Sequence, residues 1–207
     1  MELEHDLRRA IDERQFELYY QAKFDARTRA LTGAEALLRW NHPDVGLVSP
    51  VEFIPVLEET GLLVPVGQWI LGEALATAQA WRTRCPQLRI AVNVSARELR
   101  NADFLDGCRT LLAGFDGAAP IDIEVTESVV VDDIEQSVRL LQGLRELGCR
   151  VAIDDFGTGY SSLNYLVRLP VDTIKIDRSF VAMLGHSRET VTLVSNTIGL
   201  AHSLGLD

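Results

Sequence analysis

The chain has 207 residues, 47% of them hydrophobic and 24% charged, and a net charge of −10 at neutral pH. These values are ordinary for a globular protein, exclude intrinsic disorder, and suit one sizeable α/β domain. No apolar stretch approaches the roughly 20 residues of a membrane span, and the charged start does not resemble a signal peptide. We expect a cytoplasmic domain, even if other domains anchor the parent protein to a membrane. General nucleic-acid binding is not expected, because it needs clustered Lys and Arg.

Residues 1–15 form a charged helical pattern, which we interpret as a connecting helix from an upstream domain. Strand-length apolar runs then alternate with helix-length amphipathic stretches, which predicts an α/β fold with parallel strands. Helical spacing recurs in Ile70–Ala78, Ile134–Leu147 and Arg188–Leu204. The expected strands lie near Phe16–Phe24, Leu31–Trp40, Leu88–Ser95, Ile121–Thr126, Arg150–Asp155 and Thr173–Arg178.

A TIM-like (β/α)8 barrel fits this alternation, but such a barrel typically needs about 250 residues. The chain is short of that length by about two strands and two helices. Leu206-Asp207 resembles the start of a strand that is not completed. We therefore expect residues 1–207 to form a single domain whose barrel starts near residue 16 and whose C-terminal part is missing.

Cysteine and histidine residues show no metal-ligand spacing. The cysteines are expected to be reduced and inert, and three of the histidines to lie on the surface. Trp40 is expected to be a packing residue. The cysteines and histidines concerned are Cys85, Cys108, Cys149, His42, His186 and His202.

Strand parity separates aliphatic from polar side chains in four of the expected strands. In the strand Ile121–Thr126, for example, the two isoleucines and Val125 share one face, and Glu124 lies on the other. In a barrel, the aliphatic face would meet the helices, and the polar face would point inward near the carboxyl ends of the strands. The side chains that would converge there are Glu35, Asn93, Glu124, Asp154 and Lys175.

Converging carboxylates require cations, because a buried carboxylate without a partner is strongly unfavourable. Oxygen ligands select Mg²⁺, Mn²⁺ or Ca²⁺ over zinc. Asp154 and Asp155 end a strand and enter a turn that begins near Gly157, where adjacent acids can bridge two ions. Two such metals are typical of in-line displacement at phosphorus, so phosphodiester hydrolysis is the leading hypothesis.

Single residues also have simpler interpretations. Asn93 alone could bond a loop backbone, and a lone strand-end Asp is more often a turn cap than a ligand. Lys175 could merely neutralise Asp177 or an inward-facing acid. Glu127 has the opposite strand parity from Glu124, so anchoring a loop is as consistent with its position as direct ligation.

Several motifs together resemble the EAL domain family, whose signature tripeptide is Glu35-Ala36-Leu37. The resemblance spans nearly the whole chain and implies a Mg²⁺- or Mn²⁺-dependent phosphodiesterase. That enzyme would open cyclic di-GMP to linear pGpG in bacterial second-messenger signalling. The other motifs, in family order and spacing, are Tyr20-Gln21, Asn93-Val-Ser95, Glu124-Val-Thr-Glu127, Asp154-Asp-Phe-Gly-Thr-Gly-Tyr-Ser-Ser-Leu163 and Lys175-Ile-Asp-Arg-Ser-Phe180.

The resemblance also implies a role for each motif residue. Lys175 would orient the attacking water and offset developing phosphate charge, with Glu35 and Asp154 as further catalytic residues. Two metal ions would bind, and Ca²⁺ is expected to inhibit. The first ion would be held by Glu35, Asn93, Glu124 and Asp154, and the second by Asp154 and Asp155.

Substrate contacts and a loop complete the implied site. Gln21 and Arg39 would contact the nucleotide, because a guanidinium suits a phosphate or a guanine edge. The loop 156–163 would couple metal binding to formation of a homodimer, with Glu127 as its anchor. Gly157, Thr158 and Ser161 belong to this loop.

Two departures from the family pattern and several open alternatives remain. Ala22 stands where a Pro is usual, and the family's later Glu and Gln motifs would follow Asp207, which leaves activity of the chain itself open. An upstream sensor, receiver or GGDEF domain is expected, without a clue to which. Alternative functions are a catalytically inactive cyclic di-GMP receptor, a Schiff-base aldolase acting through Lys175, and a dimerising scaffold.

Overall fold

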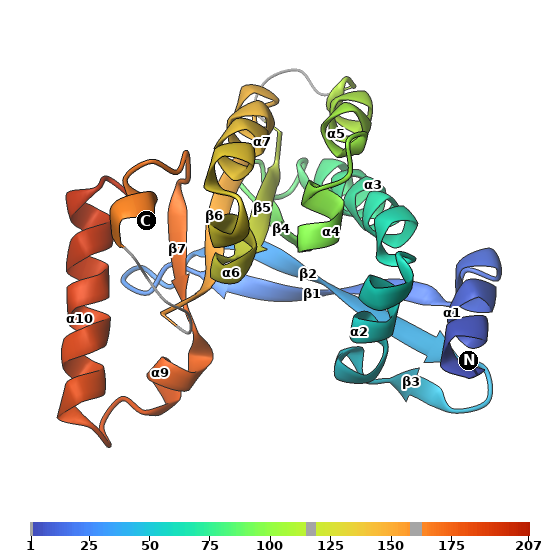
Figure 1. Ribbon diagram of the computed structural model, residues 1–207, viewed down its shortest axis with the longest axis horizontal. Coiled ribbons are helices and arrows are strands. Elements are labelled where there is room, and N and C mark those ends of the chain that lie inside the picture. The colour runs from blue at the N-terminus through green and yellow to red at the C-terminus, as the bar shows by residue number, and fades with distance from the viewer. Residues whose placement is uncertain (1, 115–118, 158–162) are drawn as a thin grey trace. The chain divides into compact units, whose positions relative to one another are not determined.

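The computed structural model describes residues 2–114, 119–157 and 163–207, and the chain divides into two compact units, Met1–Asp122 and Ile123–Asp207. Helices and strands alternate in both units (Figure 1). The first unit contains α1 (Glu2–Asp12), β1 (Phe16–Phe24), β2 (Leu31–His42), β3 (Gly46–Val48), α2 (Pro50–Thr60), α3 (Leu63–Trp81), β4 (Arg89–Asn93), α4 (Ala96–Leu99) and α5 (Phe104–Leu112). β5 (Ile121–Thr126) begins in the first unit and continues into the second.

The second unit continues with short helices and two further strands. These elements are α6 (Glu127–Asp132), α7 (Ile134–Glu146), β6 (Arg150–Phe156), α8 (Leu163–Leu166), β7 (Thr173–Ile176), α9 (Arg178–Ala182) and α10 (Arg188–Ser203). Among the described residues, no single helix has the length and apolar composition of a membrane span; α2 and α3 meet those criteria only as a pair bent by 119°.

The sheet of the first unit is mixed. β1 pairs with β2 antiparallel, β2 pairs with β4 parallel, and β3 adds to β2 antiparallel. The expectation of parallel strands is therefore wrong for β1 and β2. Their connection, Asp25–Ala30, is a tight turn in which the Asp25 side chain accepts a hydrogen bond from the Thr28 amide, whereas a parallel pair needs a crossover of a dozen or more residues.

The first unit buries an apolar core between α3 and the strands β1, β2 and β4. Trp40 is buried against Phe16 and Phe53, with ring centroids 6.1 and 5.7 Å away, which confirms the packing prediction. His42 is wrongly predicted as a surface residue: it is 8% exposed, and its Nδ1 accepts hydrogen bonds from the Asp44 and Val45 amides. β2 runs two residues past Trp40, so His42 is its last residue and pairs with Gly46 at the start of β3.

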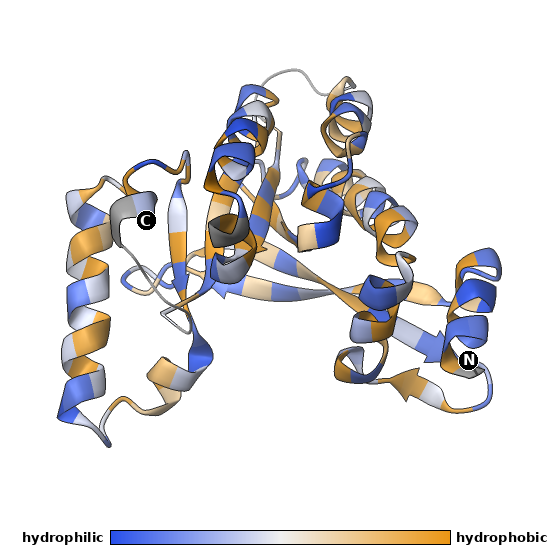
Figure 2. Cartoon of the chain, in the orientation of Figure 1, coloured by the Kyte–Doolittle hydropathy of each residue, from blue (hydrophilic) through white to orange (hydrophobic). Residues whose placement is uncertain are grey.

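In the second unit, β5, β6 and β7 are neighbours in that order, and β6 pairs with β7 parallel. α7 packs on β6, and α10 lies against β7. Figure 2 shows hydrophobic and hydrophilic residues interspersed along α10. Val194 and Ala201 are buried, whereas Val191, Leu193 and Ile198 are exposed. Asp207 extends the pairing at β7, because its amide donates to the Asp172 carbonyl and its carbonyl accepts from the Ile174 amide.

The predicted strands match the structure closely, apart from their ends. β4 and β7 stop at Asn93 and Ile176, earlier than predicted, because Ser95 and Asp177 act as N-caps of α4 and α9. β3 and the helices α2, α4, α5, α6, α8 and α9 were not predicted. None of the three cysteines forms a disulfide in the described part of the chain, and Cys108 and Cys149 are buried.

Candidate active site

A carboxylate and an amide pair on neighbouring strands of the first unit. Glu35 lies in the middle of β2, and Asn93 is the last residue of β4. In the parallel register Glu35 is aligned with Ala91, so Asn93, two residues on, lies on the same face of the sheet. The Asn93 Nδ2 donates a hydrogen bond of 2.9 Å to Glu35 Oε1. Two oxygen-bearing side chains are thus held together at the carboxyl end of β4.

The same face carries the two predicted substrate contacts. Gln21 on β1 is directly opposite Glu35 in the antiparallel register, and its side chain is exposed. Arg39 lies four residues along β2 from Glu35. Its guanidinium is 5.4 Å from the centre of the Tyr19 ring, and its Nη1 donates to the Leu38 carbonyl at 2.8 Å. An amide and an oriented cation therefore flank Glu35.

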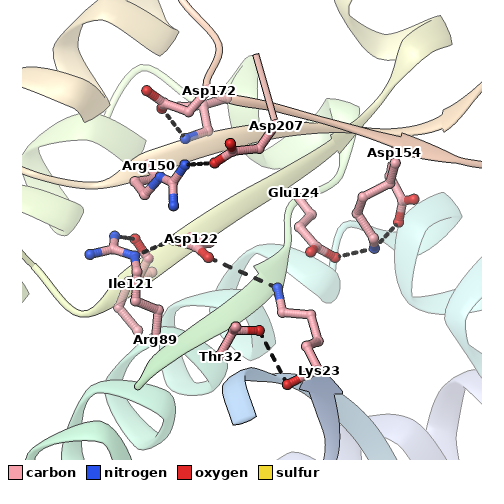
Figure 3. A network of polar contacts seen from close by, with 12 residues as sticks. Lys23, Thr32, Arg89, Ile121, Asp122, Glu124, Arg150, Asp154, Asp172 and Asp207 are labelled. Atoms are coloured by element: carbon pink, nitrogen blue, oxygen red, sulfur yellow. Dashed lines mark hydrogen bonds and ion pairs between the residues drawn. The ribbon is translucent and has the colours of Figure 1, made fainter. Parts of the chain in front are cut away.

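In the second unit, one ammonium joins two carboxylates. Lys175 Nζ donates to Glu124 Oε2 at 2.5 Å and to Asp154 Oδ2 at 2.7 Å. Figure 3 shows Glu124 and Asp154 reaching the same nitrogen from β5 and β6. Glu124 is 1% exposed, so its charge depends on this contact and on its other protein partners. The structure thus brings together three of the five residues that strand parity singled out.

Lys175 is charged in this setting. Burial lowers the pKa of its ammonium, but the negative charge of Glu124 and the hydrogen bonds to Asp154 and Glu124 outweigh burial and hold the pKa above its ordinary value. A Schiff-base aldolase needs the neutral amine of its lysine as the nucleophile. The raised pKa therefore argues against the aldolase alternative.

Asp155 occupies an unusual backbone position. Its φ is +54°, in the left-handed region that Asp tolerates better than most residues, and its amide donates to Asp154 Oδ1 at 2.9 Å. Burial, followed by the negative charges of Asp154 and Asp177, raises the pKa of the Asp155 carboxyl. Crowded acids of this kind gain from a nearby cation.

Glu127 bridges the chain on both sides of the segment 158–162. It is the first residue of α6 and is buried, and its two carboxylate oxygens accept hydrogen bonds from the Gly157 amide at 3.0 Å and from the Tyr165 hydroxyl at 2.5 Å. Gly157 has φ +98°, where a side chain would be strained, and an added Cβ would lie 3.2 Å from the Phe180 ring. One carboxylate therefore contacts Gly157 before the segment and Tyr165 after it.

Two predicted loop residues, Thr158 and Ser161, lie outside the described residues, as does most of the segment 156–163.

The chemistry of the donors fits a hard divalent ion. Glu35, Asn93, Glu124 and Asp154 offer only oxygen atoms to a metal, and two of these carboxylates already share one cationic nitrogen. Within the ranges that the structure describes, no group of three or more His, Cys, Asp or Glu side chains could hold a metal ion by itself. Each unit instead presents a pair of oxygen-bearing side chains.

Comparison with known proteins gives this arrangement a family. The family model described as EAL domain matches residues 4–207. The chain belongs to the EAL domain family. The bifunctional diguanylate cyclase/cyclic di-GMP phosphodiesterase MucR of Pseudomonas aeruginosa is 41% identical to this EAL domain over 208 residues, which cover 100% of the chain and 30% of MucR. The cyclic di-GMP phosphodiesterase PdeR of Escherichia coli is 37% identical, over 99% of the chain and 31% of PdeR.

A solved structure agrees with this membership. The chain described as PaMucR phosphodiesterase in complex with c-di-GMP superposes on this EAL domain with a TM-score of 0.94, covering 100% of this chain and 84% of that one. The predicted family and its α/β, TIM-like fold class are therefore confirmed. The chain spans less than a third of the length of the two curated relatives.

Three features near the candidate site residues were not predicted from sequence. Tyr19 packs on Arg39, Tyr165 bonds Glu127, and Glu98 is buried beside the end of β4. The alternation of β1 gave a usable signal for Tyr19, because residues 19 and 21 of a strand share a face. Ser95 and Glu98 have the Ser-x-x-Glu spacing of a capping box, which was also a usable signal. The Tyr165 contact joins residues of different elements and leaves no periodic pattern.

Proposed function

We propose that this EAL domain hydrolyses cyclic di-GMP to linear pGpG in bacterial second-messenger signalling. The observation that best supports this proposal is that the Lys175 ammonium is held between Glu124 and Asp154. A charged group in this position can act on water and on phosphate together. Membership in a family whose relatives are named cyclic di-GMP phosphodiesterases supports the choice of substrate. The activity of the whole protein that contains this chain is part of the same proposal.

The oxygen-bearing side chains are proposed to bind Mg²⁺ or Mn²⁺. Glu35, Asn93, Glu124 and Asp154 would hold one ion, and Asp154 with Asp155 would hold a second. When bound, the ions would polarise the phosphodiester and make water a better nucleophile near neutral pH. Ca²⁺ is expected to bind the same oxygens but to inhibit, since it takes more ligands in a looser geometry.

The protein's own side chains would position the reactants. The Lys175 ammonium donates hydrogen bonds, so it can hold the attacking water beside the phosphate and offset the charge that develops there. Gln21 and Arg39 lie on the Glu35 face, where the guanidinium suits a phosphate or a guanine edge. Their part would be to hold the nucleotide while water attacks in line.

The loop anchored by Glu127 is proposed to carry a dimer contact. Glu127 bonds Gly157 before the segment 158–162 and Tyr165 after it, so its carboxylate fixes both ends. A homodimer through 156–163 could then sense the state of Asp154 and Asp155, which immediately precede this loop. An upstream sensor, receiver or GGDEF domain would supply the input signal, in keeping with the greater length of the relatives.

The test is to incubate the protein with cyclic di-GMP and Mg²⁺ and to separate the nucleotides by chromatography. We expect linear pGpG from the wild type and none from Glu35→Ala. Glu59→Ala removes an exposed carboxylate of the same unit and should leave turnover unchanged. Tight nucleotide binding without product would instead support a receptor. If the protein neither binds nor hydrolyses cyclic di-GMP, the proposed substrate is refuted.

A further inference from the structure

One buried carboxylate of the first unit has no part in the proposed reaction. Glu98 in α4 is only 4% exposed, and no Lys or Arg forms an ion pair with it among the contacts of the described residues. Its Oε2 accepts hydrogen bonds from the Ser95 amide at 2.9 Å and from Ser95 Oγ at 2.7 Å. The Glu98 amide donates back to Ser95 Oγ at 3.3 Å, which completes a capping box.

A glycine of another helix makes room for this carboxylate. Gly67 lies in α3, and a Cβ added there would come within 1.7 Å of Glu98 Oε1. That atom is the end of a side chain, so a methyl group at position 67 would displace the carboxylate rather than the helix. Burial raises the pKa of the Glu98 carboxyl, as expected for an acid enclosed between two helices.

The contact fixes the turn that follows a proposed metal ligand. Ser95 is two residues after Asn93, whose amide group reaches Glu35 at 2.9 Å. α4 has only four residues, so a capping box there stabilises little helix. The box therefore holds the chain where it leaves β4, two residues after Asn93.

We propose that Glu98 is a positioning residue that, through Ser95, holds Asn93 in the geometry needed to bind a divalent cation, and that Gly67 is glycine to admit it. This inference rests on the proposed function, because it takes Asn93 as a metal ligand. Removing a residue that hydrogen-bonds to or orients a metal ligand commonly weakens metal affinity by about 10- to 100-fold. The effect should therefore be visible in metal binding, separately from stability.

The experiment measures Mn²⁺ binding to the protein by electron paramagnetic resonance, without nucleotide, together with thermal unfolding. Glu98→Ala should weaken Mn²⁺ binding by about tenfold, whereas Glu98→Gln keeps an acceptor for Ser95 and should stay within about twofold. Gly67→Ala should weaken binding like Glu98→Ala, although every proposed ligand is intact. The double variant should be no worse than either single one, because both changes remove the same contact.

A matched control is the N-cap of α10. Ser187 accepts a hydrogen bond from the Thr190 amide at 3.1 Å, in a helix that carries no proposed ligand. Ser187→Ala should lower the midpoint of unfolding but leave Mn²⁺ affinity unchanged. Equal Mn²⁺ affinity in Glu98→Ala and the wild type would overturn the positioning role. An equal loss of Mn²⁺ affinity in Glu98→Ala and Ser187→Ala would do the same. Either result would leave the proposed function standing. A wild-type protein that binds no Mn²⁺ would refute the metal centre itself, and the inference with it.

Discussion

Replacing Lys175 by Met tests the cluster on which the proposed function depends. Methionine keeps much of the length of the side chain but removes the ammonium that joins Glu124 and Asp154. The two carboxylates would then lose their shared cation while Glu124 stays buried. Lys175→Arg is the companion variant, since it restores a positive charge with a different shape.

The expected loss follows from burial. Removing one partner of a buried ion pair costs about 3–5 kcal/mol, because the remaining charge is left in a poorly solvated place. The Lys175 side chain is 26% exposed, so the lower end of that range, about 3 kcal/mol at pH 7, is expected. For comparison, Arg145 pairs with Asp172 at 3.0 Å with its side chain 42% exposed, and Arg145→Met should cost less than about 1 kcal/mol.

Urea unfolding without added metal measures the loss of stability in Lys175→Met and in Arg145→Met. Its pH dependence tests whether the pKa of Lys175 is raised in the folded state. The folded pKa of Lys175 is raised, so its contribution is fully present below the unfolded pKa of about 10.4 and is lost as pH rises through the folded pKa. The difference between wild type and Lys175→Met should be constant from pH 7 to 9 and shrink at higher pH. A Lys175→Met protein no less stable than Arg145→Met would refute the assignment of a buried charge cluster.

Three further predictions concern single side chains. Glu127→Ala leaves the Gly157 amide and the Tyr165 hydroxyl without their acceptor and should cost about 2–4 kcal/mol in urea unfolding; an unchanged free energy would contradict the anchor, and Glu127→Gln should cost less. Trp40→Ala should lower the free energy of unfolding by about 3–5 kcal/mol while leaving Mn²⁺ affinity intact, and a changed affinity would contradict a purely packing role. The folded pKa of Glu98 is raised, so its ionisation opposes folding as pH rises above about 4.3; Glu98→Gln should gain stability relative to wild type between pH 4 and 7, measured by urea unfolding across that range, and a constant difference would contradict the raised pKa.

Strand alternation carried most of what sequence could predict about the site. Glu124, Asp154 and Lys175 were singled out because every second residue of their strands is aliphatic, and the structure brings these three side chains together. The same rule put Glu35 and Asn93 on one face of β2 and β4. Backbone geometry fixes this period regardless of tertiary context, so the prediction needed no knowledge of packing.

The sequence predictions were wrong or incomplete where local hydrogen bonds or contacts between distant residues determine the structure. Ser95 and Asp177 resemble strand residues in an apolar pattern, but each caps a helix and ends its strand early. The antiparallel pairing of β1 and β2 could have been predicted from the short connection between them. The Glu98 contact with Gly67 could not, because it depends on the approach of α3 to α4 and leaves no trace in either segment.

The most direct test of the central claim is anomalous X-ray diffraction from crystals of the protein grown with Mn²⁺ and cyclic di-GMP. The account predicts a manganese peak ligated by the proposed set Glu35, Asn93, Glu124 and Asp154. A manganese peak bound to other residues would contradict the proposed ligand set.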